Sequence, residues 1–167
     1  MRRLLLSISP DAQIDIVTGI YTAETADSFD LESYDYIVDA IDSLADKALL
    51  IHNATRARRP RLFSSMGAAL KLDPTRIRTA EFSRVTGCRL AAALRRKFKK
   101  SDLSPARKFP CVYSDELLPN RGALPDASDG SMTYGKVAVN GSLCHITAIF
   151  GLTLAGLIVR AIAAKAD

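Results

Sequence analysis

The chain has 167 residues and a formal net charge of +5 at pH 7, a size for which one domain with its own core is the default. Its three cysteines, at positions 88, 111 and 144, lack CxxC spacing. This argues against a zinc knuckle and a secreted disulfide framework, and predicts a reducing compartment such as the cytoplasm. The apolar stretch after Arg2 and Arg3 stops at Ser7, short of a signal peptide's hydrophobic region.

The first predicted elements are short. We expect the end of a helix at 2–8, a strand at 13–18 and a helical turn at 22–29 that Thr22 caps. The rest of the chain can be placed relative to residues 34–43, which read as a strand that runs into a loop and then into a helix.

Two carboxylates follow the central strand. The apolar run 36–38 predicts a strand buried on both faces, and Ser43 suits the N-cap of an amphipathic helix at 44–57. Asp39 and Asp42 would lie beyond the carboxyl end of the strand, where open α/β sheets bind ligands. They either bond to nearby amides and shape the turn, or bind Mg²⁺ together with a nucleotide. Both alternatives stay open for Asp39, and the metal is favoured for Asp42.

The middle of the chain predicts two more strands and a helix. We expect the next strand at 62–66, because Gly67 lets the chain turn beyond it. From Arg76 to Phe82, Ile77, Thr79 and Glu81 alternate with Arg78, Ala80 and Phe82. This alternation predicts an antiparallel strand at 76–82 near the sheet edge. Gly87 breaks the chain before a helix at 89–100.

A dense group of basic residues lies on that helix, off its apolar stripe. Such a cationic surface suits nucleic-acid phosphates, because binding releases condensed counterions. A solvated helix end explains the same charges equally well. The residues are Arg95, Arg96, Lys97, Lys99 and Lys100.

The last third combines loops with a long apolar segment. We expect a mobile loop at 101–109, a strand at 110–113, a flexible loop at 117–136 and a helix at about 142–164. A membrane span is the rival interpretation of that helix, but its uninterrupted apolar length falls short of the ~18 to 20 residues that a bilayer demands. We therefore expect it to pack on the sheet or in a dimer interface.

The cysteines and histidines show no catalytic pattern. His52 and His145 have no nucleophile or acid nearby in sequence, which favours structural roles for both. Cys88, Cys111 and Cys144 are interpreted as small buried apolar residues, since a nucleophilic thiolate needs a lowered pKa that no pattern here indicates.

Five groups of residues carry a family resemblance: Asp39-Ala40-Ile41-Asp42-Ser43; Ile8-Ser9-Pro10-Asp11-Ala12; the run from Gly67 to Ile77; the run from Cys111 to Glu116; and Asn140-Gly141-Ser142 with Phe150-Gly151. Taken in their order along the chain, these five groups resemble the ubiquitin-activating-like superfamily of adenylating enzymes. Within it they are most similar to the tRNA threonylcarbamoyladenosine dehydratases. The likeness covers nearly the whole chain, and residues 39–43 match the superfamily's Asp-x-x-Asp-Ser/Asn segment.

The resemblance implies a fold and a reaction. The fold is α/β: an incomplete Rossmann-like sheet of parallel strands with helices on both faces, extended by antiparallel strands and ending in a long apolar helix. Residues 1–167 would form one domain that matches the second half of the family's adenylating domain. The implied reaction uses ATP and Mg²⁺ to adenylate the threonylcarbamoyl carboxylate on a tRNA adenosine, which then closes into a cyclic hydantoin with loss of water.

The resemblance also implies roles for residues and partners. Asp42 matches the aspartate that faces the metal and the nucleotide, and the tRNA substrate favours phosphate binding by the basic helix. The family's proteins are cytoplasmic homodimers, with no membrane partner. No catalytic residue is carried over, because this chain lacks the cysteine that some members carry before the segment matched by Asn140-Gly141.

The family's ATP cradle is missing from this sequence. The cradle is a strand followed by a glycine-rich turn at a helix N-terminus. We therefore expect the chain to be a carboxyl-terminal portion that is inactive alone, unless another chain supplies the first half. The alternatives are a non-catalytic tRNA-binding module and a fragment without a function of its own.

Overall fold

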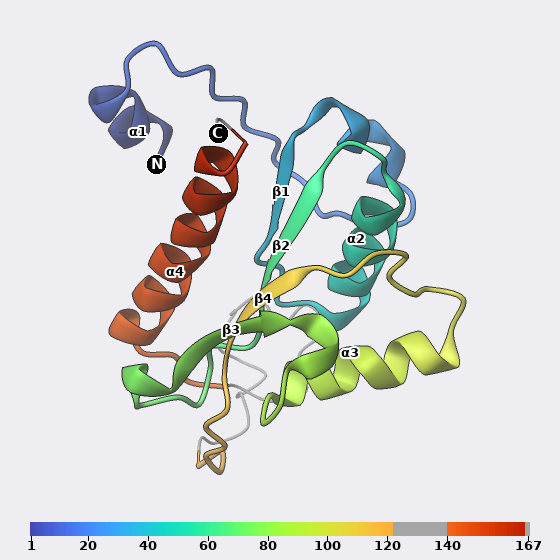
Figure 1. The fold of residues 1–167 in the computed structure, drawn as a ribbon, viewed down its shortest axis with the longest axis vertical. Coiled ribbons are helices and arrows are strands. Elements are labelled where there is room, and N and C mark those ends of the chain that lie inside the picture. Colours follow the sequence, from blue (N-terminus) through green and yellow to red (C-terminus); the bar gives the residue numbers. More distant parts are fainter. Residues whose placement is uncertain (122–139, 166–167) are drawn as a thin grey trace, which may run out of the picture.

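The chain folds around a four-stranded mixed sheet. In the computed structural model, which describes residues 1–121 and 140–165, the strands lie in the order β1-β2-β4-β3 (Figure 1). β1, β2 and β4 run parallel, and β3 runs antiparallel to β4 at one edge. This confirms the predicted Rossmann-like sheet with an antiparallel extension. The strands are β1 (Tyr36–Asp39), β2 (Arg61–Ser65), β3 (Ile77–Glu81) and β4 (Pro110–Ser114).

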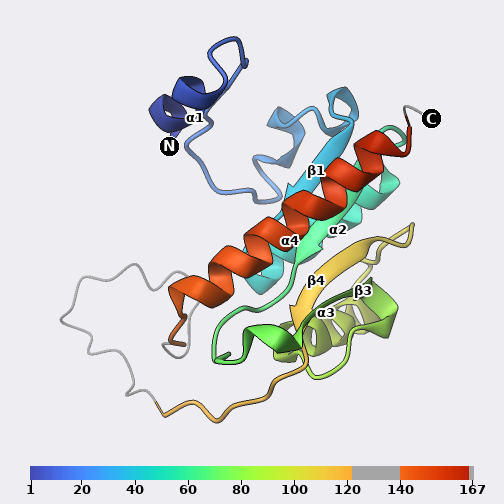
Figure 2. The same ribbon diagram turned by 60° about the vertical axis from the view of Figure 1, so that its left-hand side comes forward.

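Helices cover the sheet from both sides, as predicted. α2 and α3 pack on one face and α4 packs on the other (Figure 2). Side chains alternate along each strand, so Leu62 and Cys111 join the core under α2 and α3, while Phe63 and Val112 join the core under α4. The helices are α2 (Leu44–Arg56), α3 (Arg89–Lys100) and α4 (Cys144–Ala163), close to their predicted bounds.

The beginning of the chain differs from the prediction. α1 (Arg2–Ile8) is a helix as expected, but none of its residues is buried. Residues 13–18 form no strand, because no other described strand pairs with them. The helical turn at 22–29 contains the short 3₁₀ helix Ala26–Ser28, whose N-cap is Thr25 rather than Thr22.

β1 is less buried than its apolar sequence predicts. Ile37 and Asp39 are buried, but Val38 on the opposite face is 48% exposed. α4 reaches only the beginning of this strand, where the Tyr36 hydroxyl lies 3.5 Å from the carbonyl oxygen of Ala161. The prediction of burial on both faces is therefore wrong for Val38, because β1 is an edge strand that α4 covers incompletely.

α4 is apolar over a greater length than the sequence analysis expected. It has 20 residues and a mean hydropathy of 2.0 over its most apolar stretch, so length and composition alone would let it cross a membrane. The argument that it is too short is therefore wrong. One side of the helix packs on the sheet through Ile146, Phe150 and Leu154, as one of the two predicted arrangements required.

Gly87 sets the turn before α3, as predicted. Its φ of +64° lies in the left-handed region. A Cβ atom there would lie 2.5 Å from the carbonyl oxygen of Asp115 and 2.8 Å from its Cα atom. The close approach of these two backbone segments therefore requires glycine.

We expect Gly87→Ala to lower the free energy of unfolding by about 2 kcal/mol or more, because it adds left-handed strain and a backbone clash. Gly156→Ala is the matched control, since Gly156 lies on α4 with no atom near the added Cβ. It should raise the free energy of unfolding by about 0.5 to 1 kcal/mol. Urea denaturation of both variants measures the difference. Equal free energies of unfolding would contradict the conclusion that the backbone at position 87 requires glycine.

Candidate nucleotide site and basic helix

The carboxyl ends of β1, β2 and β4 meet at one edge of the sheet, because these strands run parallel and lie next to each other. The loop after β1 carries Asp42, the loop after β2 carries Lys71, and the chain after β4 carries Glu116. In α/β sheets ligands bind beyond this edge.

A buried ion pair anchors the loop between β1 and α2. Lys47 Nζ lies 2.7 Å from Asp39 Oδ2, and neither side chain is exposed. Lys47 also donates to the carbonyl oxygens of Ser65 (2.8 Å) and Ile41 (3.2 Å). Asp39 accepts hydrogen bonds from the Ser64 hydroxyl (2.5 Å) and the Ile41 amide (3.1 Å). Of the two alternatives for Asp39, the geometry therefore supports the structural one.

Asp42 lies in the anchored loop and is exposed. It directly precedes Ser43, the N-cap of α2, whose hydroxyl makes no capping hydrogen bond. In the described part of the chain, no three His, Cys, Asp or Glu side chains come together as a metal site. A Mg²⁺ ion here would have to share one carboxylate with waters and nucleotide phosphates, an arrangement that Mg²⁺ commonly adopts in phosphate sites.

A second buried lysine ties the neighbouring loops together. Lys71 Nζ donates to the carbonyl oxygens of Ser114 (3.2 Å) and Glu116. The Glu116 carboxylate in turn accepts from the amides of Leu72 (2.8 Å) and Asp73 (3.1 Å). Burial lowers the pKa of Lys71, against the opposing influence of Cys88 and Glu116. Sequence reasoning missed this pair, because nothing in its spacing brings residue 71 to residue 116.

The adjoining residue, Leu70, has a strained backbone. Its φ is +57°, a left-handed conformation that is uncommon for a residue other than glycine. The amide of Leu70 donates to the carbonyl oxygen of Gly141 at 2.9 Å. Strain of this kind gathers at functional sites, and here it lies in the loop beyond the carboxyl end of β2.

The basic residues of α3 divide into two groups. Arg96, Lys99 and Lys100 are exposed, and Lys97 is half-buried. Arg95 instead donates to the carbonyl oxygen of Val85 at 3.0 Å and lies over the Phe82 ring at 5.8 Å. Arg95 therefore holds the turn before α3, and the surface open to a polyanion consists of the exposed group.

The burial predicted for the cysteines is confirmed at two of the three positions. Cys88 and Cys111 are buried, and burial raises the pKa of the Cys111 thiol. Cys144, the first residue of α4, is exposed, so its predicted burial is wrong. His52 Nδ1 accepts from the Ser104 amide at 3.0 Å, and burial, followed by nearby Arg56, lowers the pKa of His52.

The other predicted loops have different outcomes. In the 101–109 loop, Arg107 donates to carbonyl oxygens at the end of α2, including that of Thr55 at 2.8 Å, which ties the loop to the helix. Residues 117–121 form no helix or strand, and the remainder of the predicted 117–136 loop lies outside the described residues.

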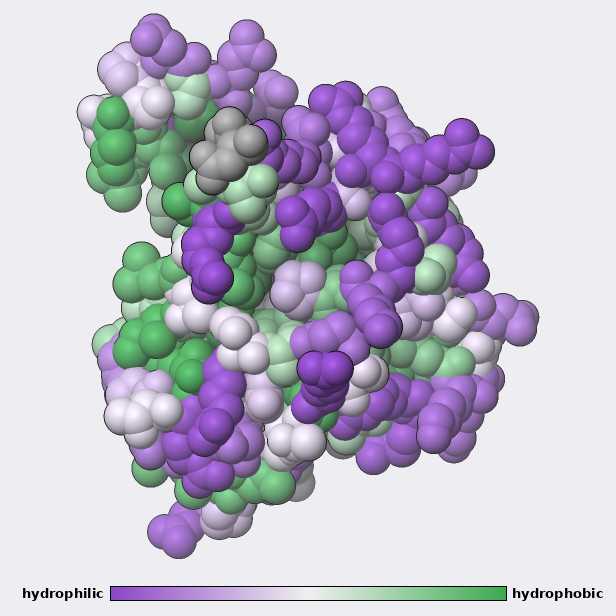
Figure 3. All heavy atoms as spheres, in the orientation of Figure 1, coloured by the Kyte–Doolittle hydropathy of each residue, from purple (hydrophilic) through white to green (hydrophobic). Residues whose placement is uncertain are grey.

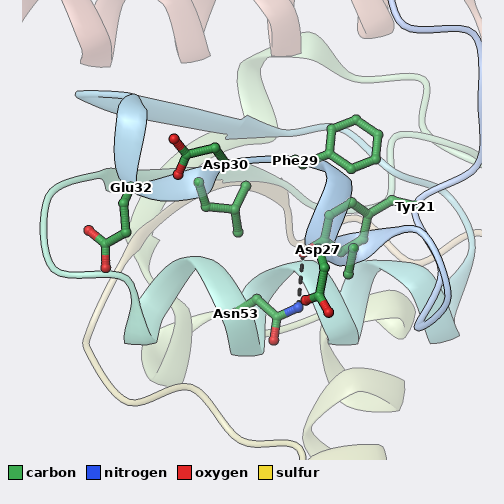
Figure 4. A pocket seen from close by; sticks show the side chains of 8 residues that line it. Tyr21, Asp27, Phe29, Asp30, Glu32 and Asn53 are labelled. Carbon is green, nitrogen blue, oxygen red and sulfur yellow. Dashed lines mark hydrogen bonds between the residues drawn. The ribbon is translucent and has the colours of Figure 1, made fainter.

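A hollow of about 430 Å³ lies away from this edge. It is formed by the segment before β1 and by Asn53 in the second half of α2 (Figure 4). Asn53 Nδ2 donates to the Tyr21 hydroxyl at 2.9 Å, and the Glu32 carboxylate accepts from the amides of Arg58 and Arg59. These groups hold the segment against α2, and the hollow contains none of the predicted site residues.

The chain resembles known proteins over most of its length. It is 32% identical to the tRNA threonylcarbamoyladenosine dehydratase of Bacillus subtilis over 116 residues, which is 70% of this chain. It is 28% identical to the dehydratase of the same name from Escherichia coli over 99% of its length. It spans 44% and 66% of the lengths of these two relatives.

Solved structures agree with the sequence comparison. Crystal structures of the E. coli tRNA N6-threonylcarbamoyladenosine dehydratase in complex with AMP and with ATP superpose with TM-scores of 0.76 and 0.78, at 27% and 26% identity. Each match covers 99% of this chain and 63% of the other. No protein-family model matches the chain.

Exchanging each aspartate for asparagine should separate the roles of Asp39 and Asp42. Asp39→Asn leaves the buried Lys47 charge without its carboxylate and should cost about 3 to 5 kcal/mol of stability. Asp42→Asn changes an exposed side chain and should stay within about 0.5 kcal/mol. Urea unfolding followed by circular dichroism measures both, and similar losses would refute the division.

Proposed function

Because the chain is homologous to part of the tRNA threonylcarbamoyladenosine dehydratases, we propose that it takes part in the ATP-dependent modification of tRNA. The observation that carries the proposal is the match to the E. coli enzyme, which extends over 99% of this chain in both sequence and structure. That enzyme has been solved with ATP and with AMP, the nucleotides expected before and after an adenylation.

The proposed reaction activates a carboxylate. The threonylcarbamoyl carboxylate on a tRNA adenosine attacks the α-phosphorus of ATP and releases pyrophosphate. A nitrogen of the same side chain then attacks the activated carbonyl carbon, and AMP leaves as the hydantoin ring closes. Bound Mg²⁺ would neutralise phosphate charge during the first step.

In this chain, Asp42 would bind the Mg²⁺ ion together with the nucleotide. Its carboxylate is exposed at the ligand-binding edge of the sheet, in a loop whose position is set by buried Asp39 and Lys47. A loop held in this way presents a metal ligand with little loss of conformational entropy on binding.

The exposed residues of α3 would bind the tRNA backbone. Arg96, Lys99 and Lys100 lie off the buried side of the helix, where Ala91 and Leu94 pack into the core. Lys97 is half-buried and would contribute less, while Arg95 is already bound to backbone carbonyl groups. We further propose that the protein acts in the cytoplasm as a homodimer, without a membrane partner.

A non-catalytic tRNA-binding module is the second candidate, and the exposed basic group on α3 favours it. The two functions differ in their need for ATP. In the sequence, no two of the nine glycines are closer than five residues, so the chain has no glycine-rich turn to hold the phosphates.

We expect the 167-residue chain alone to bind Mg²⁺-ATP more weakly than the micromolar range, because Asp42 alone supplies little binding energy without a phosphate cradle. Isothermal titration calorimetry measures this directly. Micromolar affinity would contradict the claim that tight ATP binding needs a cradle that this sequence lacks.

Replacing Arg96, Lys99 and Lys100 together by Gln should weaken tRNA binding about tenfold or more and flatten its dependence on salt, by up to about 0.9 units of slope per lost phosphate contact. The melting temperature should barely change, since all three side chains are exposed. Fluorescence anisotropy at several salt concentrations measures affinity and slope.

The matched control changes the same net charge elsewhere. Arg3, Arg61 and Arg160 are exposed and lie on α1, β2 and α4. Their replacement by Gln should leave most of the affinity intact. If both triple variants weaken binding equally, the attraction is a property of net charge, and α3 is an ordinary solvated face.

A further inference from the structure

Arginine residues are concentrated where α2 ends. Four of the six residues from 56 to 61 are arginines, and all four are exposed. Arg61 differs from the other three, because its guanidinium lies over the Phe63 ring at 5.8 Å and Phe63 belongs to the core under α4. Arg56, Arg58 and Arg59 remain as a basic group at the end of α2.

The end of α2 does not need this group as a cap. Basic side chains near a helix C-terminus commonly bind its last carbonyl groups and interact favourably with its dipole. Arg107 already does so, because its guanidinium donates to five backbone carbonyl oxygens between residues 54 and 60, including that of Thr55 at 2.8 Å. Capping therefore accounts for Arg107 and does not account for the charges of Arg58 and Arg59.

Little negative charge neutralises these arginines. Asp35 Oδ1 lies 3.3 Å from Arg59 Nε, but both side chains are more than half exposed, and such ion pairs contribute little. The Glu32 carboxylate accepts hydrogen bonds from the backbone amides of Arg58 and Arg59. Among the described residues, Asp35 is the only ion-pair partner in this region. We call this surface the α2-end patch, and it consists of Arg56, Arg58, Arg59 and Arg107.

The basic end of α3 lies close to the α2-end patch. α3 ends at Lys100, and three residues later the carbonyl oxygen of Ser104 accepts a hydrogen bond from Arg56 at 2.7 Å. The Ala106 amide then donates to the Thr55 hydroxyl at 3.0 Å. Figure 1 shows this loop running from the end of α3 to the end of α2, and Figure 3 shows hydrophilic side chains gathered on that side of the molecule. The two basic groups are therefore neighbouring parts of one surface.

This surface lies far from the candidate nucleotide site. α2 begins beside Asp42, and its 13 residues extend about 20 Å to the α2-end patch. A phosphate group bound at the patch is therefore about 20 Å away from a group held at Asp42. A long polyanion fits this arrangement, and a single nucleotide does not.

We infer that the α2-end patch binds the phosphate backbone of a helical stem of an RNA, next to the backbone contacts of α3. Binding would release counterions condensed on the backbone, and a guanidinium group can bind a phosphate through two hydrogen bonds. The stem would lie apart from the reacting adenosine, so this contact adds affinity without recognising the adenosine. The inference rests on the proposed function for RNA as the ligand, and it deepens that function by assigning a second RNA-binding surface.

An anionic membrane is the other polyanion that fits a basic patch. Proteins that lie on such membranes combine basic residues with apolar side chains that enter the interface. In the described structure, none of the exposed large apolar side chains belongs to residues 50–61 or 101–110. RNA therefore fits the α2-end patch better than a membrane does.

The test replaces Arg58 and Arg59 together by Gln in the 167-residue chain and measures binding of fluorescein-labelled tRNA by anisotropy at several salt concentrations. Affinity should fall about tenfold, and the salt slope should flatten by up to about 0.9 units per lost phosphate contact. The melting temperature should barely change, because both side chains are exposed and Arg107 still binds the end of α2. The matched control replaces Arg3 and Arg160, which are exposed on α1 and α4, and should keep nearly the full affinity.

An RNA duplex of about 16 base pairs separates a contact to a stem from a contact to the modified adenosine. The double variant should bind this duplex about tenfold more weakly than the wild-type chain does. A loss of affinity for tRNA without a loss for the duplex would overturn the inference, because the patch would then contact a part of the RNA other than a stem.

Other results would also overturn the inference. If the double variant binds tRNA as tightly as the wild-type chain while the triple variant of α3 binds it more weakly, the second surface falls and the proposed function stands. Equal losses in the double variant and its control would assign the effect to net charge. A wild-type chain that binds phosphatidylserine vesicles but no RNA would overturn the inference together with the RNA-binding part of the proposed function.

Discussion

The buried ion pair between Asp39 and Lys47 is the interaction on which the candidate ligand-binding edge of the sheet depends. Removing two charges from water is costly, and the cost is offset only when every donor and acceptor is satisfied. Here the pair is completed by hydrogen bonds to Ser64, Ser65 and Ile41. Because these partners come from β2 and from the loop after β1, the pair fixes the loop, the start of α2 and the end of β2 relative to one another.

This constraint separates two carboxylates that look equivalent in the sequence. Asp39 is buried and stabilises the fold through Lys47. Asp42, three residues later, is exposed on the loop that this ion pair anchors. The same division recurs on α3, where Arg95 binds backbone carbonyl groups and leaves Arg96, Lys99 and Lys100 exposed. In both places one member of a polar group stabilises the fold and the others face solvent.

Much of the fold could be predicted because its signals are local. The apolar periodicity of α2, α3 and α4 and the turn at Gly87 placed these elements within a few residues. Where the prediction failed, the outcome depended on a distant partner. Residues 13–18 are apolar enough for a strand but have nothing to pair with, and Val38 is exposed because α4 reaches only the start of β1.

The candidate site was predictable to the same degree. The loop after an apolar strand locates Asp42, but only tertiary contacts separate its role from that of Asp39. Lys47 lies within a helix whose pattern gives no sign that its ammonium group is fully buried, and the contact between Lys71 and Glu116 joins loops that lie far apart in the sequence. Whether these lysine side chains are buried depends on contacts between distant segments of the folded chain, which no local sequence pattern indicates.

Asp39 and Lys47 act as one unit in this structure, and a double-mutant cycle with Asp39→Leu and Lys47→Met measures their coupling most directly. The two variants should each destabilise strongly, while the double variant should lose much less than their sum, with a coupling of about 2 kcal/mol or more. Additive losses would contradict the account, because they would mean that the two charges do not hold the loop together.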